Sequence, residues 1–199
     1  MNLSEIFYSL QGEGGRVGQP SIFIRLQGCS MQNACFESGI QCDTEFESGT
    51  LRAAKEIADT VASLMPEPRA VILTGGEPLL AYDGALHDAL RAVGVKTIAC
   101  ETNGSTKPKA PIDYVACSPK VAEHVVAKNF PHGVNELRYV RHVGQAIPVP
   151  FNVAQTYPLS PMFDGDKLNR ENFEWCVKLV KEHPEWRLST QLHKAWQVR

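Results

Sequence analysis

Short apolar runs rich in β-branched residues alternate along the chain with longer segments in which apolar residues recur at helical spacing. The short runs predict strands at residues 22–26, 70–73, 95–99, 114–116, 136–140 and 186–188. The longer segments predict helices at residues 51–65, 84–93 and 171–183. This alternation indicates an α/β fold with a mainly parallel sheet and outer helices, in a single domain over residues 1–199.

Polar motifs follow four of the predicted strands. They are residues 74–77 (TGGE), residues 101–104 (ETNG), residues 118–120 (SPK) and the pair Gln191 and His193. In parallel barrels and open α/β sheets, the active site lies at the C-terminal ends of the strands. Turns are polar in any protein, which accounts for the glycines and the asparagine but less well for the repeated Glu, Thr and Lys. The motifs therefore favour a functional site at this edge.

Three of the six cysteines, Cys29, Cys35 and Cys42, lie close together in the sequence. Three thiolates can hold an iron–sulfur cluster and leave one iron without a protein ligand, where a cofactor can bind. A structural zinc site needs four soft ligands, and this segment contains no histidine. Zinc binding and three unrelated thiols are the alternatives. The other cysteines have apolar or helical surroundings that predict burial: Cys100, Cys117 and Cys176.

Composition narrows the class of protein. The formal net charge is −2 and no run of lysine or arginine is present, which argues against a nucleic-acid partner. No apolar stretch is long enough to span a membrane. Residues 1–5 lack the basic and apolar regions of a signal peptide. We therefore expect a cytoplasmic protein whose cysteines stay reduced.

The cysteine segment and residues 74–78 (TGGEP) together resemble the radical S-adenosylmethionine enzymes. Further segments narrow the resemblance, and they recur in order: residues 11–14 (QGEG), 23–29 (FIRLQGC), 42–44 (CDT), 101–104 (ETNG), 118–120 (SPK) and 186–194 (WRLSTQLHK). On these segments the chain resembles the 7-carboxy-7-deazaguanine synthases, from about residue 5 onward.

The gaps of five and six residues between the three cysteines are wider than in the usual superfamily motif. A longer loop costs little chain entropy, about 0.6 kcal/mol per doubling of its length. Some members of the family carry inserted cluster loops. We expect an expanded cluster loop at about residues 29–42, with Cys35 as the middle ligand because it is the only cysteine between the outer two.

The resemblance implies a carbon–nitrogen lyase of queuosine and deazapurine biosynthesis. Its reaction is the radical-mediated ring contraction of 6-carboxy-5,6,7,8-tetrahydropterin to 7-carboxy-7-deazaguanine, with loss of ammonia. The implied cofactors are a 4Fe-4S cluster, S-adenosyl-L-methionine and Mg²⁺. The implied fold is a partial, TIM-like β/α barrel. The implied partners are the pterin, an external electron donor such as flavodoxin and a second copy in a homodimer, with no nucleic acid and no membrane.

The resemblance also assigns site residues. The 4Fe-4S ligands are Cys29, Cys35 and Cys42, and the magnesium ligand is Thr44. The residues assigned to S-adenosylmethionine are Gln41, Cys42, Asp43, Gly76, Glu77, Ser118, Pro119, Lys120, Ser160, Pro161, Met162 and Phe163. The residues assigned to the substrate are Leu10, Gln11, Gly12, Glu13, Arg25, Thr74, His193 and Arg199.

Two of these residues suit their tasks on chemical grounds. The guanidinium of Arg25 can form a fork with the substrate carboxylate, a contact worth roughly 1.5–3 kcal/mol. The alternative is a strand arginine on a solvated face, which its apolar neighbours disfavour. The carboxylate of Glu13 offers two acceptors to the guanidine-like edge of a pterin, although a plain glycine-rich turn would also explain this segment. The assignment of His193 to the substrate rests on the match of the surrounding residues 191–194 to the family, because a lone histidine is more often structural.

Two other functions remain open from the sequence. One is a radical enzyme that activates a protein partner, which would need an open face for a peptide. Arg25 and Glu13 favour a small acid with a heterocyclic edge instead. The other is a zinc-stabilised binding module without catalytic activity, which metal analysis would separate from an iron–sulfur enzyme.

Overall fold

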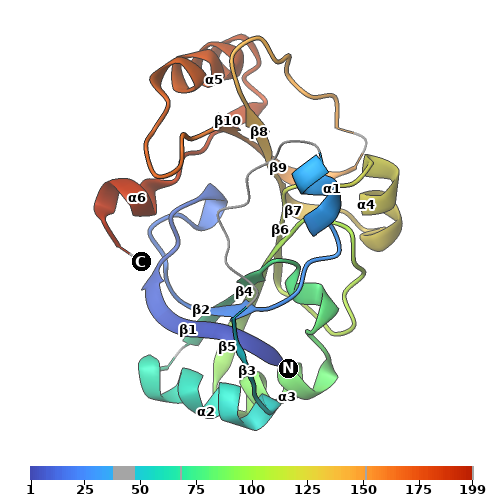
Figure 1. Cartoon of the computed structure of the whole chain (residues 1–199), viewed down its shortest axis with the longest axis vertical. Helices are drawn as coiled ribbons and strands as arrows, with labels where there is room; N and C mark the ends of the chain where they lie inside the picture. The colour runs from blue at the N-terminus through green and yellow to red at the C-terminus, as the bar shows by residue number, and fades with distance from the viewer. Residues whose placement is uncertain (38–47, 68, 151, 199) are drawn as a thin grey trace.

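The computed structural model describes residues 1–37, 48–67, 69–150 and 152–198 (Figure 1). One sheet of ten strands organises these residues. The strands are β1 (Asn2–Leu10), β2 (Pro20–Leu26), β3 (Thr50–Leu51), β4 (Arg69–Gly75), β5 (Val95–Thr102), β6 (Tyr114–Cys117), β7 (Val134–Leu137), β8 (Tyr139–Arg141), β9 (Ala154–Pro161) and β10 (Trp186–Leu188). Their order is β10-β9-β7-β6-β5-β4-β2-β1-β3, and β8 pairs with β9. Neighbours from β2 to β10 are parallel, whereas β1 is antiparallel to β2 and β3.

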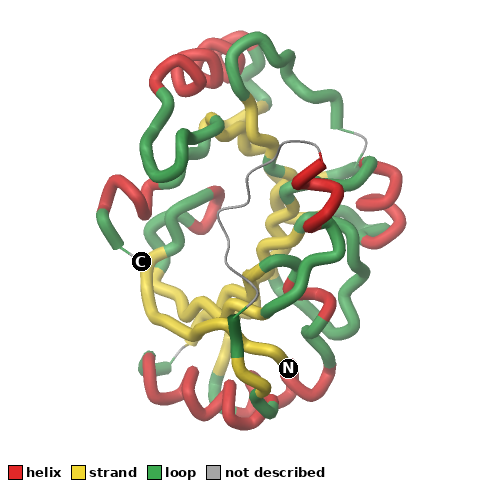
Figure 2. Tube along the Cα trace, viewed as in Figure 1, coloured by secondary structure: helices red, strands yellow, loops and turns green. Residues whose placement is uncertain are grey.

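The longer helices lie on the outer side of this curved sheet. The helices are α1 (Gln32–Glu37), α2 (Ala54–Leu64), α3 (Gly84–Ala92), α4 (Glu123–Asn129), α5 (Arg170–Glu182) and α6 (Leu192–Trp196), with short 3-10 turns η1 (Gly14–Arg16) and η2 (Pro78–Leu80). Figures 1 and 2 show α2, α3, α4 and α5 around the outside of the sheet, with α6 and the segment after β1 on its inner side. The mixed α/β fold with a mostly parallel sheet confirms the predicted class. Among the described residues, no helix combines the length and the apolar composition needed to cross a membrane.

Strand β2 shows how one sequence pattern serves two faces of the sheet. Ile22, Ile24 and Leu26 alternate along it, and all three are fully buried in the main core. Their neighbours Phe23 and Arg25 point to the opposite face, because successive side chains of a strand alternate between faces. The outer face therefore packs against helices, while the inner face is free to carry polar chemistry.

Two predicted elements have different bounds in the structure. The predicted strand 136–140 is interrupted at Arg138, so β7 and β8 keep one register on β9 but are separate. The backbone N–H of Arg138 donates to the carbonyl of Cys117 on the neighbouring strand β6 (2.8 Å). The predicted helix 51–65 begins only at α2, because Leu51 pairs with Asn2 of β1 and is exposed.

Two long strands were not predicted, and both break the usual strand patterns. In β1 the register shifts between Leu3 and Glu5, which disrupts the alternation of apolar and polar residues. In β9 two prolines, Pro158 and Pro161, argue against a strand with neighbours on both sides, yet β9 lies between β7 and β10. Helices α1, α4 and α6 were not predicted either, and each has at most seven residues.

Candidate active site

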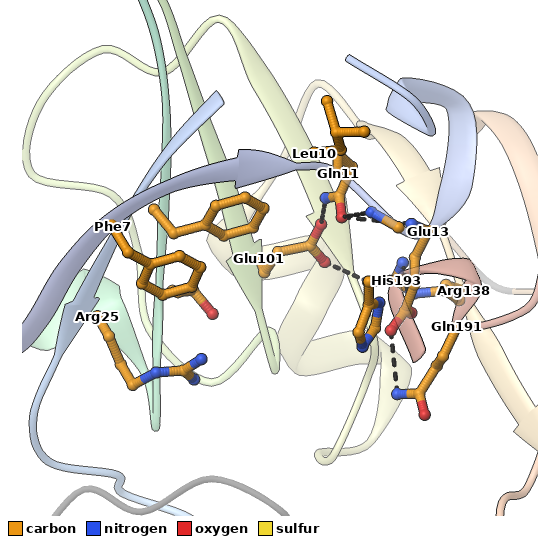
Figure 3. Close-up of a pocket in the computed structure, with 12 residues that line it drawn as sticks. Phe7, Leu10, Gln11, Glu13, Arg25, Glu101, Arg138, Gln191 and His193 are labelled. Carbon is orange, nitrogen blue, oxygen red and sulfur yellow. Dashed lines mark hydrogen bonds and ion pairs between the residues drawn. The ribbon is translucent and has the colours of Figure 1, made fainter. Parts of the chain in front are cut away.

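A pocket of about 240 Å³ opens on the inner face of the sheet (Figure 3). The side chains and backbone around it come from Phe7, Leu10, Gln11, Gly12, Glu13, Phe23, Arg25, Thr74, Glu101, Arg138, Gln191 and His193. Seven of the eight residues predicted to bind substrate are among them: Leu10, Gln11, Gly12, Glu13, Arg25, Thr74 and His193. The eighth, Arg199, lies outside the described residues. The structure thus brings these residues together, and their individual roles stay predictions.

Strand register explains part of this convergence. Arg25 of β2 pairs with Thr74 of β4, so both side chains leave the sheet side by side on the inner face. Glu101 extends from the end of the next strand, β5. The chain's C-terminal segment reaches the same place because the N–H of Leu192 donates to the carbonyl of Gly12 (3.0 Å). A side chain at position 12 would meet the imidazole of His193 at 2.2 Å, so this close approach requires glycine.

The end of the pocket near β2 is cationic and aromatic. Arg25 donates from Nε to Glu5 Oε1 (2.9 Å) and keeps about a quarter of its side chain exposed. The rings of Phe7 and Phe23 stack nearly parallel, with their centroids 5.1 Å apart. An aromatic wall beside a half-buried guanidinium suits a flat heterocycle that carries an acid group.

The opposite end is a network of acids around one buried arginine (Figure 3). Arg138 Nη1 lies 2.9 Å from Glu13 Oε2, and Arg138 Nη2 donates to Glu101 Oε2. Gln11 Nε2 donates to Glu101 Oε1 (2.8 Å), and Gln191 Nε2 donates to Glu13 Oε1 (3.0 Å). Arg25 and this network lie at opposite ends of the labelled side chains. The pocket is therefore bipolar.

Electrostatics differ between the members of the network. Burial raises the pKa of Glu101 to about 7, although Arg138 acts to lower it. Burial alone would lower the pKa of Arg138, but the carboxylates of Glu101, Glu13 and Glu136 outweigh burial and raise it. Arg138 therefore stays charged, whereas Glu101 changes its charge close to neutral pH.

Five lining residues had no predicted role: Phe7, Phe23, Glu101, Arg138 and Gln191. Glu101 and Gln191 belong to motifs at strand ends, and that position was the signal that could have identified them. Arg138 was hidden inside a predicted strand. Its place at a strand end became visible only with the break between β7 and β8.

The first cysteine, Cys29, lies against the TGGEP turn. Cys29 is half-buried, and its Sγ accepts from the N–H of Met31 (3.4 Å) and from Asn103 Nδ2 (3.6 Å). The N–H of Glu77 donates to the carbonyl of Gly28 (2.9 Å), and a Cβ at Gly76 would lie 2.7 Å from that of Cys29. Donors around an accessible sulfur suit a thiolate ligand.

The other cysteines behave differently. Cys35 on α1 is half-buried, whereas Cys100, Cys117 and Cys176 are buried, as predicted. Burial raises the pKa of Cys117 to about 12 and that of Cys176 to about 11, so neither is a ready thiolate. Within the described parts of the chain, no three His, Cys, Asp or Glu side chains are grouped closely enough for a metal ion. The predicted third ligand, Cys42, falls outside those parts, as do Gln41, Asp43 and Thr44.

The described residues that are predicted to contact S-adenosylmethionine lie at or just beyond the C-terminal ends of parallel strands. Glu77 is fully buried and accepts from Thr102 Oγ1 and from the N–H groups of Leu79 and Asn103. The N–H of Ser118 donates to the carbonyl of Thr102 (2.8 Å). This bond places Ser118, Pro119 and Lys120 beside the ETNG segment at the end of β5.

The end of β9 contributes a second segment of this predicted cofactor site, Ser160, Pro161, Met162 and Phe163. Ser160 Oγ is buried at this strand end, and no described residue forms a hydrogen bond with it. A buried hydroxyl without a partner is costly, and a polar ligand would relieve that cost. Met162 is exposed, and the ring of Phe163 lies 5.1 Å from Lys194 Nζ.

Comparisons with known proteins agree with this geometry. A 7-carboxy-7-deazaguanine synthase of Bacteroides thetaiotaomicron is 39% identical over 202 residues, covering 99% of this chain and 98% of the relative. One of Bradyrhizobium diazoefficiens is 37% identical, with coverage of 99% and 98%. The crystal structure of QueE from Escherichia coli shares the fold with a TM-score of 0.68 at 23% identity, covering 96% of this chain and 93% of that one. No family model matches the chain. The identity to the curated relatives over nearly the whole chain shows that it belongs to the 7-carboxy-7-deazaguanine synthase family.

Proposed function

We propose that this chain converts 6-carboxy-5,6,7,8-tetrahydropterin to 7-carboxy-7-deazaguanine with loss of ammonia, as a radical S-adenosylmethionine lyase. The observation that carries this proposal is the bipolar pocket. Arg25 meets the substrate carboxylate at one end, and the network of Glu13 and Glu101 accepts from the heterocycle's donor edge at the other. A peptide would not need both features in a pocket of about 240 Å³.

The chain's own residues bind and orient the substrate. Charged partners at both ends fix the ring, and the Phe7–Phe23 wall limits how it can tilt. When bound, the 4Fe-4S cluster and S-adenosylmethionine supply the radical that takes a hydrogen atom from the substrate. Cys29, Cys35 and Cys42 would hold the cluster. Ser118, Ser160 and their neighbours would hold the cofactor, which accords with the unpartnered Ser160 hydroxyl.

The direct test is an anaerobic assay of the reconstituted enzyme with the tetrahydropterin, S-adenosylmethionine and a reductant. We expect a product whose mass corresponds to the substrate minus ammonia. Protein that contains zinc and no iron would favour the binding module. Cleavage of S-adenosylmethionine that the pterin neither redirects nor slows would favour the protein activase.

The proposal also covers the overall architecture, the partners and the location of the protein. The run of parallel strands from β2 to β10, with helices outside, supports an incomplete β/α barrel in one domain. The proposal also includes an expanded cluster loop at about residues 29–42. A homodimer and an electron donor such as flavodoxin complete the proposed system. We place the protein in the cytoplasm, where thiols stay reduced.

Magnesium is proposed to bind at Thr44, which lies outside the described residues. Mg²⁺ takes few protein ligands and retains waters, so the loss of one hydroxyl should weaken its binding. We expect Thr44→Ala to turn over more slowly and to need more magnesium, while it keeps its cluster. Thr44→Ser retains the oxygen and should lose much less. Identical magnesium titrations for the wild type and both variants would exclude Thr44 as a ligand.

Substrate binding should depend on pH through Glu101. Its raised pKa of about 7 means that the carboxylate is mostly protonated at pH 6 and mostly ionised at pH 8. If the ionised form accepts the donor edge, affinity for the tetrahydropterin should rise about tenfold over this range. Equilibrium dialysis under anaerobic conditions measures it. Glu101→Gln should bind weakly with a flat profile, and an equally steep profile in that variant would assign the titration to another group.

A further inference from the structure

Arg138 makes contacts for which the site residues predicted from the sequence give no explanation. Its side chain is 8% exposed, and its two terminal nitrogens contact different carboxylates. Nη1 lies 2.9 Å from Glu13, and Nη2 donates to Glu101. Both acids line the pocket, so one guanidinium connects the two groups that face the substrate's ring.

The nitrogen atoms around Glu13 and Glu101 are distributed evenly over the oxygens of the two carboxylates. Within the part of the chain that the structure describes, each of the four carboxylate oxygens of Glu13 and Glu101 lies close to one side-chain nitrogen. Arg138 contacts one oxygen of each residue, Gln191 contacts the second oxygen of Glu13, and Gln11 contacts the second oxygen of Glu101. An ionised carboxylate has about four lone-pair sites. The protein therefore fixes both carboxylates while leaving acceptor capacity on every oxygen.

We propose that Arg138 is a specificity-determining positioning residue, which holds Glu13 and Glu101 in the arrangement that reads the 2-amino edge of the substrate's ring. This inference rests on the proposed function and deepens it. The planar fork of an arginine can reach two acids at once, which the point charge of a lysine cannot reproduce. Without the arginine the two acids would repel each other, and the nearby carboxylate of Glu136 would add to that repulsion.

The test combines a conservative variant with a matched pair of ligands. The ligands are 6-carboxy-5,6,7,8-tetrahydropterin and its lumazine counterpart, in which a carbonyl oxygen replaces the 2-amino group. Both carry the carboxylate for Arg25, so they differ only at the edge assigned to the acids. Dissociation constants are measured anaerobically on the reconstituted enzyme without S-adenosylmethionine, for the wild type and Arg138→Lys. Arg91→Lys serves as the control, because Arg91 pairs with Asp113 away from the pocket.

We expect Arg138→Lys to weaken binding of the pterin about tenfold, and to weaken binding of the lumazine much less. The variant would therefore lose discrimination between the two ligands, whereas Arg91→Lys would keep it. Equal losses for both ligands would overturn the inference, because a residue with only a structural role would affect them alike. Failure of the wild type to bind the pterin would instead overturn the proposed function itself.

A second variant covers the case in which Arg138→Lys does not fold. Gln191→Leu removes the other donor to Glu13 at the partly exposed edge of the network. It should reduce the same discrimination by a smaller factor, with a melting temperature close to that of the wild type. Unchanged discrimination in a folded Gln191→Leu variant would overturn the inference.

Discussion

Replacing Cys29 with alanine is expected to remove the iron–sulfur cluster and to abolish turnover. The structure places Cys29 in the loop that follows β2, half-buried, with two N–H donors directed at its sulfur. It also lies against Gly76 of the turn proposed to meet the cofactor. Because each thiolate holds one iron, anaerobic reconstitution should fall from about four iron atoms per chain to less than one.

Cys176→Ala is the matched control, since Cys176 lies on α5, is buried in a small core with Leu159 and Trp186, and has a pKa that burial raises to about 11. That variant should keep both its iron and its brown colour. Cys35→Ala and Cys42→Ala are expected to behave like Cys29→Ala. A Cys35→Ala variant with full iron content and activity would show that another residue is the middle ligand.

Replacing Arg25 with glutamine should weaken substrate binding by about one to two orders of magnitude. A hydrogen bond to a charged group is worth about 1.5–3 kcal/mol, so the loss corresponds to roughly a ten- to 150-fold weaker affinity for the tetrahydropterin. Arg25→Lys should recover only part of this affinity, because an ammonium does not reproduce the planar fork. Binding of the substrate to the anaerobic enzyme measures the effect directly.

The controls for Arg25 separate its role from general damage. Unproductive cleavage of S-adenosylmethionine without pterin should persist in both variants, which shows that the cluster is intact. A 6-methyl tetrahydropterin, which lacks the carboxylate, should bind equally to the wild type and to Arg25→Gln. If the 6-methyl compound also loses affinity, Arg25 supports the pocket in some way other than by pairing with the acid.

The strands with regular patterns could be predicted from the sequence, and those with local irregularities could not. Residues 22–26, 70–73 and 95–99 are apolar and β-branched, and the structure confirms each as a strand. The bulge in β1 and the prolines in β9 obscure the local strand signal, and these strands form because they pair with neighbouring strands. Local sequence contains no information about such neighbours.

The residues of the site also fall into those that the sequence could predict and those that it could not. Residues in recognisable motifs, such as Glu13 and His193, could be assigned before their surroundings were known. Partners in the network could not, since Glu13 and Gln191 are 178 positions apart and meet only through the fold. The function of Arg138 likewise depends on two acids from distant segments, which no local pattern indicates.

The closure of the pocket by both ends of the chain also has a consequence for protein synthesis. The N–H of Gly14 donates to Ser189 Oγ (3.0 Å), and the carbonyl of Gly12 accepts from Leu192. A ribosome that has released only the residues up to β9 has therefore produced most of the sheet but no finished substrate pocket. Contacts of such long sequence separation also form late and slowly. A nascent chain should thus become competent to bind the pterin only after its last helix has emerged.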